Sequence, residues 1–349
     1  METAGSKTVV VTGAGGYIGS VLVPKLLDKG YRVKAIDRFF FGRDKLPQHE
    51  QLTAVREDVR RLTEDHLAGA YAVIDLVAIS NDPSGEWFRE ATYQINHQAR
   101  ARTARLAKRV GVRRYILPSS CSVYGIQEPG VIADENSPTN PITTYAKANE
   151  MAERDVLPLA DDDFAVTVMR QATIFGLSPR MRFDLAINGM TYGAFETGKI
   201  PLMRDGTQWR PMLHVQDTTD AMLLLLECDP QLVNGQVFNV GSFNCQLGDL
   251  ARQIVRALPC DAGIEWYGDP DRRSYRVDFG KITRVLGWKA KYTAADGALE
   301  IYEALKSGKL VKDDETMTLK WYQELNKWHR IIKERELYGS MLDALTMTG

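Results

Sequence analysis

A glycine-rich turn near the start of the chain has the residue types that bind a diphosphate. Gly13, Gly16 and Gly19 follow a strand pattern rich in β-branched residues at 8–12 and precede a helix pattern at 20–29. In such a strand–turn–helix unit, backbone N–H groups and the positive end of the helix converge where a pyrophosphate can sit. Glycines that serve only the backbone of the turn would give the same pattern.

An acidic residue follows this turn at the distance expected for a nucleotide site. Asp37 ends a second strand pattern at 31–36, about twenty residues after the turn, where a carboxylate hydrogen-bonds the ribose hydroxyls of adenosine. A carboxylate there repels a 2′-phosphate, which favours NAD over NADP. Two alternatives stay open: Arg38 could bind that phosphate, and Asp37 could be a turn residue at the end of a strand.

The elements that must position these residues alternate along the chain. Further strand patterns lie at 54–59, 72–78, 114–118 and 164–169, and helix patterns lie at 87–109 and from Thr144 to Pro158. This alternation predicts an α/β fold with a Rossmann-type, doubly wound parallel sheet. We expect residues 1–176 to bind NAD and residues 177–349 to form a smaller, mixed substrate-binding part, interleaved with returning elements of the sheet.

The composition argues against several classes of protein. The 349 residues carry a formal net charge of −1, so no overall basic field favours nucleic acid. There is no run of 18 apolar residues, and the polar segment 1–7 does not resemble a signal peptide. The four cysteines form no C-x-x-C pair, which argues against a zinc site. We expect a cytoplasmic protein with no metal, no membrane association and no nucleic-acid partner.

Several motifs, in a fixed order along the chain, carry a family resemblance. They are Thr12 with the spacing G-x-x-G-x-x-G, Ser-Ser-Cys-Ser-Val-Tyr-Gly at 119–125, Tyr-Ala-Lys-Ala-Asn at 145–149, R-x-x-x-H-V-x-D at 210–217, D-x-R-x-Y at 271–275 and Leu-Gly-Trp at 286–288. This set resembles the extended short-chain dehydrogenase/reductase family, of the NAD-dependent nucleotide-sugar epimerase and dehydratase type. The resemblance covers roughly residues 8–305.

The resemblance implies a catalytic centre at Ser120 and Tyr145. Ser120 stands where the family has the hydroxyl that hydrogen-bonds the reacting substrate oxygen. Tyr145 stands where the family has its general base or acid, whose phenol needs a nearby positive charge to ionise near neutral pH. A lysine one helical turn on supplies that charge in the family, but this chain has Asn149. Lys147, about 200° round the helix, should face away, so we expect Tyr145 to lack its cation and activity to rise towards alkaline pH.

The resemblance also implies residues that bind NAD and a nucleotide sugar. In the family, the Asp-Val pair found here at 58–59 contacts adenine, and arginines hold the nucleoside diphosphate. The residues expected to bind NAD are Gly13, Gly16, Tyr17, Ile18, Gly19, Asp37, Arg38, Asp58, Val59, Leu76, Ala78, Asn96, Ser119 and Tyr145. Those expected to bind the substrate are Thr173, Arg182, Asn188, Arg210 and Arg273. His214 is interpreted as a structural residue, and a homodimer is expected.

The reaction type is less constrained than the family. Family dehydratases carry Asp-Glu directly after the catalytic hydroxyl residue, whereas this chain has Cys121 and Ser122. Cys121 is kept as a candidate catalytic residue, but a thiol and a serine are poor bases there, which disfavours a 4,6-dehydratase. The leading interpretation is an epimerase that oxidises a sugar hydroxyl, usually at C4, and returns the hydride to the other face. A nucleotide-sugar reductase or dehydrogenase is the runner-up, and Asn149 leaves open a non-catalytic NAD-binding protein.

The last part of the chain predicts one more helix. Residues 319–337 place apolar side chains at helical spacing. Such a stripe more often packs on the rest of the molecule than binds a partner.

Overall fold

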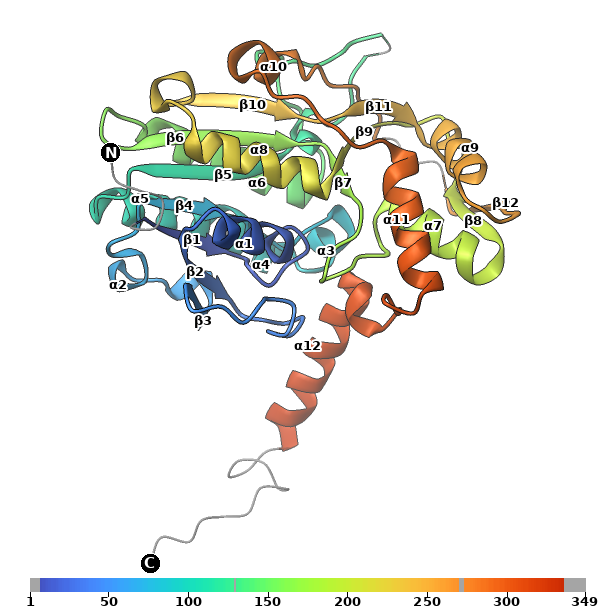
Figure 1. The fold of residues 1–349 in the computed structure, drawn as a ribbon, viewed down its shortest axis with the longest axis horizontal. Helices are drawn as coiled ribbons and strands as arrows, with labels where there is room; N and C mark the ends of the chain where they lie inside the picture. Colours follow the sequence, from blue (N-terminus) through green and yellow to red (C-terminus); the bar gives the residue numbers. More distant parts are fainter. Residues whose placement is uncertain (1–6, 129, 270–272, 336–349) are drawn as a thin grey trace, which may run out of the picture.

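The centre of the molecule is a seven-stranded parallel sheet in the order β3-β2-β1-β4-β5-β6-β10 (Figure 1). The computed structural model describes residues 7–128, 130–269 and 273–335. The strands are β1 (Thr8–Thr12), β2 (Arg32–Asp37), β3 (Leu52–Arg56), β4 (Ala72–Asp75), β5 (Arg114–Ser120), β6 (Ala165–Gln171) and β10 (Gln236–Val240). The predicted doubly wound sheet is confirmed. Chain order reverses between β1 and β4, and ligands of such sheets bind outside the strand ends at this point.

Helices cover both faces of this sheet (Figure 1). One cluster of buried side chains joins it to α1 (Gly19–Asp28) and α8 (Val215–Glu227), and the other to α5 (Arg100–Arg109) and α6 (Thr144–Val156). Val9 and Val11 of β1 belong to the first cluster and Val10 to the second, because successive side chains of a strand point to opposite faces. Burial on both faces explains why these strands read as continuous apolar runs.

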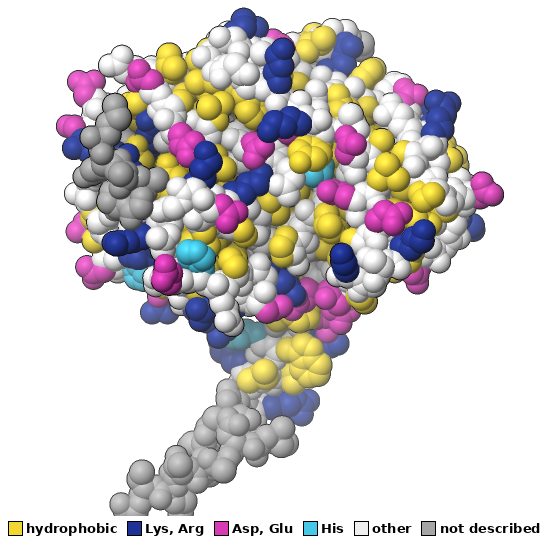
Figure 2. All heavy atoms as spheres, viewed as in Figure 1, with side chains coloured by type: hydrophobic (Ala, Val, Ile, Leu, Met, Phe, Trp, Pro, Cys, Tyr) yellow, Lys and Arg dark blue, Asp and Glu magenta, His cyan; other side chains and the backbone are white. Residues whose placement is uncertain are grey.

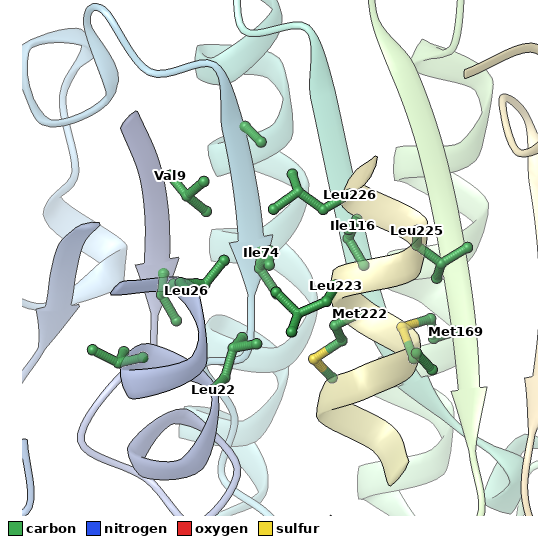
Figure 3. Packing of buried hydrophobic residues seen from close by; sticks show 14 of the residues in the cluster. Val9, Leu22, Leu26, Ile74, Ile116, Met169, Met222, Leu223, Leu225 and Leu226 are labelled. Atoms are coloured by element: carbon green, nitrogen blue, oxygen red, sulfur yellow. The ribbon is translucent and has the colours of Figure 1, made fainter. Parts of the chain in front are cut away.

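The helix α1 is held on the sheet by its leucines. Leu22 and Leu26 face Ile74 of β4, and Leu223 of α8 packs beside them (Figure 3). This packing places the N-terminal end of α1 at the carboxyl end of β1, where the glycine turn lies.

Two structural differences from the sequence prediction have local causes. The strand expected at 54–59 ends at Arg56, because the Asp58 side chain accepts the N–H of Arg60 and begins a 3-10 turn. The helix expected at 87–109 is not continuous. It consists of the short helices α3 (Asp82–Trp87) and α4 (Arg89–Thr92), a π-helical segment at Tyr93–Ala99, and α5. Such π segments often lie near functional sites.

The second half of the chain builds a smaller, mixed part and returns β10 to the central sheet. The strands β7 (Thr173–Phe175), β9 (Trp209–His214) and β11 (Phe243–Gln246) form a mixed sheet. The strands β8 (Lys199–Met203) and β12 (Gly263–Tyr267) form a separate parallel pair. The helices of this half are α7 (Ala186–Thr197), α9 (Leu247–Ala257), α10 (Gly280–Leu286) and α11 (Ala294–Lys306), and α2 (Glu64–Leu67) completes the first half. The mixed C-terminal part is therefore confirmed, whereas its boundary at residue 176 stays a prediction.

The helix α12 (Thr318–Arg335) projects from the body of the molecule (Figure 1). Its first turns pack through Tyr322, whose ring centroid lies 5.5 Å from that of Phe41 and 6.3 Å from that of Phe88. Trp328 and Ile332 are exposed, and basic, acidic and apolar side chains intermingle over the face of the body seen in Figure 2. The predicted helix is confirmed to Arg335, and the remainder of that prediction lies outside the described residues.

None of the helices within residues 7–128, 130–269 and 273–335 combines the length and the apolar character that a membrane span needs.

We predict that Leu26→Ala lowers the free energy of unfolding by about 2–5 kcal/mol, because it leaves a cavity in a packed core. Leu26 is fully buried, whereas Leu299 is 38% exposed, so Leu299→Ala should cost less than about 1 kcal/mol. Denaturant unfolding of the two variants checks this difference. Equal losses would contradict the assignment of Leu26 to the core.

Candidate active site

A cavity of about 1450 Å³ opens at the carboxyl ends of the strands, between the central sheet and the C-terminal part. Its walls contain most of the residues expected from the sequence. They are Gly13, Gly16, Tyr17, Ile18, Gly19, Asp37, Arg38, Asp58, Val59, Leu76, Ala78, Ser119, Ser120, Tyr145, Thr173, Arg182, Arg210 and Arg273. Four expected residues do not line it: Asn96, Cys121, Asn149 and Asn188.

The glycine turn forms a cradle whose backbone faces this cavity. Gly13 has φ +66°, and a Cβ there would lie 2.7 Å from the backbone nitrogen of Val77. At Gly16 a Cβ would instead meet the Gly13 carbonyl oxygen alone, at 3.1 Å. Helix α1 begins directly after the turn, and its N-cap Ile18 provides no capping side chain. The N–H groups of the first turn therefore lack a side-chain acceptor, and the anionic pyrophosphate of NAD fits this end of the helix.

Asp37 is held at the end of β2 by the glycine turn. Its carboxylate accepts the N–H of Gly15 at 3.0 Å and that of Phe39 at 2.7 Å. Burial raises the pKa of this carboxyl, and the two hydrogen bonds oppose the rise. Arg38 does not lie free beside it, because its Nη1 pairs with Asp58 Oδ2 at 3.0 Å. This pairing weakens the alternative that Arg38 binds a 2′-phosphate.

Asp58 is an ion-pairing centre at the same end of the cavity. Its carboxylate accepts hydrogen bonds from the backbone N–H and the guanidinium of Arg60. The bonds from Arg60, ahead of that from Arg38, lower the pKa of Asp58 to about 2. Asp58 is therefore charged at neutral pH, and it holds both arginines in place.

Tyr145 and Ser120 share one wall of the cavity. Ser120 ends β5, and Tyr145 lies in the first turn of α6. Burial raises the pKa of the Tyr145 phenol, and the carboxylate of Asp82 raises it further. The charge of Arg100 and hydrogen bonds with Asn149 and Ser120 act in the opposite direction. The hydroxyl expected to hydrogen-bond the substrate and the phenol expected to exchange a proton with it thus lie together.

Asn149 bridges Tyr145 to a buried arginine that the sequence analysis missed. Its Nδ2 donates to the backbone oxygen of Tyr145 at 3.0 Å, and its Oδ1 accepts from Arg100 Nη1 at 3.0 Å. The structure therefore corrects the expectation that Tyr145 lacks a nearby cation. Arg100 lies 49 positions before Asn149 in the chain, and nothing in the local pattern of α5 connects the two. Lys147 is exposed, as expected.

The other three residues outside the cavity wall hold backbone in place. The thiol of Cys121 lies 3.2 Å from the carbonyl oxygen of Arg170, and burial raises its pKa. The Asn96 amide in the π-helical segment binds both the N–H and the carbonyl of Ile79. Cys121 is expected to act on substrate and Asn96 to contact NAD, but their polar atoms have partners within the protein, and neither residue is in the cavity wall.

Asn188 was expected to bind the substrate, and its amide is likewise satisfied within the protein. It accepts the N–H of Gly176 at 3.0 Å and donates to the Tyr17 hydroxyl at 3.0 Å and to the Arg182 carbonyl at 2.9 Å. Tyr17 lines the cavity with its ring, but its hydroxyl also donates to the Gly176 carbonyl. Asn188 therefore holds Tyr17, Gly176 and Arg182 together behind the cavity wall.

Arginines from the C-terminal part line the side of the cavity that faces Tyr145. Arg210 Nη1 donates to the carbonyl oxygens of Trp209 and Arg273, and Arg273 pairs with Asp82. Arg182 forms a two-point ion pair with Asp184, at 3.0 and 2.8 Å. Asp271 and Arg272 of the same motif lie outside the described residues. His214 is fully buried, with Nε2 2.8 Å from Glu300 Oε1, as expected of a structural residue.

The end of the cavity beside Asp37 is lined in part by residues that the sequence analysis did not place there. They are Tyr322 of α12 and Arg180. The Arg180 guanidinium lies 3.6 Å from the Phe41 ring centroid, and its charge lowers the pKa of Asp37. Burial raises the pKa of Tyr322 to about 12, so its phenol is neutral. No local sequence pattern indicates that Arg180 and Tyr322 belong to the site, because their contacts join segments far apart in the chain.

We predict that the protein binds NAD more tightly than NADP and that Asp37→Ala weakens NAD binding roughly tenfold or more. Hydrogen bonds to a charged group contribute about 1.5–3 kcal/mol, and the substitution removes the repulsion of a 2′-phosphate. Titration of each variant with both cofactors measures the dissociation constants. Asp44→Ala is the control, because the Asp44 side chain is 72% exposed. Tighter binding of NADP by the native protein would overturn this prediction.

Comparisons with known proteins agree with this architecture. Residues 9–241 match the family described as the NAD dependent epimerase/dehydratase family. UDP-arabinose 4-epimerase 1 of Arabidopsis thaliana is 28% identical over 334 residues, which cover 84% of this chain and 77% of the relative. UDP-glucose 4-epimerase of Lactobacillus helveticus is 27% identical over 317 residues, covering 83% and 94%. The solved structure of MoeE5 in complex with UDP-glucuronic acid and NAD has a TM-score of 0.77 at 26% identity, covering 86% of this chain and 99% of that chain. The chain therefore belongs to the NAD-dependent epimerase/dehydratase family, of the extended short-chain dehydrogenase/reductase type.

Proposed function

We propose that this protein is an NAD-dependent epimerase that inverts C4 of a UDP sugar. The observation that carries the proposal is one cavity that holds the glycine cradle, Ser120 with Tyr145, and the arginines of the C-terminal part. The relatives named UDP-arabinose 4-epimerase and UDP-glucose 4-epimerase support the choice of nucleotide and carbon.

The residues present suit the proposed mechanism. The cradle at Gly13, Gly16 and Gly19 would hold the pyrophosphate of NAD, and Asp37 its adenosine ribose. When bound there, NAD would supply a hydride acceptor for C4 and, in its reduced form, a hydride donor. Tyr145, as phenolate, takes the proton of the C4 hydroxyl, and the C4–H electron pair leaves as hydride, so that a ketone forms. Ser120 hydrogen-bonds the same oxygen, and Tyr145 returns the proton when the ketone is reduced.

The geometry bears differently on each of the alternative functions. A 4,6-dehydratase needs an acid and a base directly after Ser120, but the Cys121 thiol faces the Arg170 carbonyl and does not line the cavity. A one-way reductase or dehydrogenase would use the same Tyr145 and would differ by releasing its cofactor in the other redox state. A non-catalytic role was favoured by Asn149 alone, and the buried Arg100 beside it weakens that argument.

The remaining assignments are part of the same proposal. We infer that residues 1–176 bind NAD and that residues 177–349 bind most of the sugar nucleotide. The residues of the cavity wall that we assign to this substrate are Thr173, Arg182, Arg210 and Arg273. A homodimer and a cytoplasmic location, the latter expected from the composition, remain our predictions.

We predict that the purified protein interconverts a UDP sugar and its C4 epimer without net formation of NADH. UDP-glucose, UDP-arabinose and UDP-glucuronic acid are the substrates to test, with products resolved by NMR and NADH followed by absorbance. Tyr145→Phe should lower kcat by roughly 10²-fold or more, because it removes the proton-transfer group. Stoichiometric NADH would instead support the dehydrogenase. Full activity of Tyr145→Phe would contradict the proposed base.

Arg210 offers a separate test of the nucleotide site. We predict that Arg210→Ala raises KM roughly tenfold or more with a smaller change in kcat, because charged hydrogen bonds to a diphosphate contribute about 1.5–3 kcal/mol. Arg276→Ala is the matched control, because Arg276 packs on the neighbouring Trp209 ring and is not among the residues of the cavity wall. Unchanged KM in Arg210→Ala would remove Arg210 from the proposed substrate site.

A further inference from the structure

The charge environment of Tyr145 contains a cation that comes from outside its own helix. Arg100 is 1% exposed at the start of α5. Its Nη2 donates to the backbone oxygen of Asp75 at 2.9 Å and to that of Pro118, and its Nη1 donates to Asn149. The guanidinium therefore lies where β4, β5 and α6 meet, one side chain away from the residue proposed as the base.

Asn149 holds this cation beside the helix turn that carries Tyr145. Its amide oxygen accepts from the guanidinium, and its amide nitrogen donates to the backbone carbonyl of Tyr145 in the first turn of α6. The guanidinium is thereby fixed against the residue that stands one turn after Tyr145. Its charge acts on the phenol through the buried interior, where charges are weakly screened.

We propose that Arg100, held in place by Asn149, supplies the fixed positive charge that a lysine four residues after Tyr145 would supply. This inference rests on the proposed function, because it assigns the group that lets Tyr145 act as a base. Arg100 is a positioning residue: Asn149 anchors it behind the base, and it is not among the residues of the cavity wall. An arginine suits this place because it stays charged at every pH of interest and can serve several acceptors at once.

Other charges near Tyr145 do not replace this one. Asp82 is negative and acts against ionisation of the phenol, and it pairs with Arg273. The carboxylate of Asp75 lies 3.6 Å from Arg100 Nε and offsets part of its charge, and it also accepts from the hydroxyls of Thr12 and Tyr115. Other charged groups on elements around α6 are engaged with partners of their own: Glu86 with the N–H of Thr144, Glu153 with Arg170, His97 and Arg105 with Asp155, and Glu150 with Arg154. Lys147 is exposed on the same helix. The charge of Arg100 favours ionisation of the phenol.

The first experiment replaces the charge. Arg100→Met should raise the pKa of Tyr145 by roughly one unit or more, as expected for loss of a nearby opposite charge, and move the profile of kcat against pH towards alkaline pH by the same amount. The pKa is read directly from NMR of NAD-loaded protein carrying ¹³C-labelled tyrosine, with Tyr145→Phe assigning the signal. Arg114→Met is the matched control, because Arg114 is also a buried arginine that donates to two backbone carbonyls, those of Leu225 and Cys228. It should leave the Tyr145 titration unchanged.

The second experiment moves the charge instead of removing it. In Arg100→Met combined with Asn149→Lys, the ammonium sits one turn after Tyr145, and the pKa should return to within about half a unit of the native value. Asn149→Lys alone places two buried cations side by side and should lower Tm more than the double substitution does. A merely structural role of Arg100 cannot produce this rescue, because the lysine does not restore the bonds to the carbonyls of Asp75 and Pro118.

Three results would overturn the proposal. They are a native Tyr145 titration in Arg100→Met, a shift of equal size in Arg114→Met, and a double variant that folds but titrates like Arg100→Met. If Arg100→Met does not fold, Asn149→Leu removes the anchor of Arg100 while keeping its charge, and a native titration in that variant also overturns the proposal. Loss of turnover on every UDP sugar with the expected titrations intact would overturn the proposed function and leave the role of Arg100 standing.

Discussion

The buried carboxylate of Asp75 organises the centre of this molecule. It ends β4 with no solvent exposure, accepts hydrogen bonds from Thr12 of β1 and Tyr115 of β5, and pairs with Arg100 of α5. A buried charge is tolerated only when it is paired and hydrogen-bonded, so these elements must meet at one place. That place is the switch point of the sheet, directly beneath the glycine turn and the loop after β4.

The need to pair the buried carboxylate of Asp75 also fixes a charged group near Tyr145. Arg100 is held by Asp75 and by strand-end carbonyls, and its Nη1 reaches Asn149, which lies one turn after Tyr145. Asp82 and Arg273 form a pair that joins the first half of the chain to the C-terminal part. The charge of Arg100 favours ionisation of the Tyr145 phenol, and that of Asp82 opposes it. Packing of several elements, rather than a single neighbouring side chain, therefore sets the tendency of this phenol to ionise.

The C-terminal part completes the cavity instead of forming a separate site. Arg180, Arg182 and Arg210 line it from segments after β6, and α12 contributes Tyr322 at the end beside Asp37. A parallel sheet brings all its strand ends to one edge but leaves that edge open. Elements that follow the sheet in the chain cover this edge and line the cavity, whereas β10 and α8 return to the sheet itself.

The sequence by itself determined the parallel sheet, the glycine cradle, Asp37, and the placing of Ser120 and Tyr145. Each of these depends on a local pattern: buried β-branched runs, turn glycines, and a motif at the end of a strand or the start of a helix. The roles of Asn96, Cys121, Asn149 and Asn188 were decided by the tertiary structure, because a side chain aimed at the cavity and one bonded to backbone read alike in sequence. Arg100 went unrecognised for the same reason, since its partners Asp75, Pro118 and Asn149 come from three different elements. A local pattern records which face of a helix is buried, whereas folding alone decides which buried charge meets which acceptor.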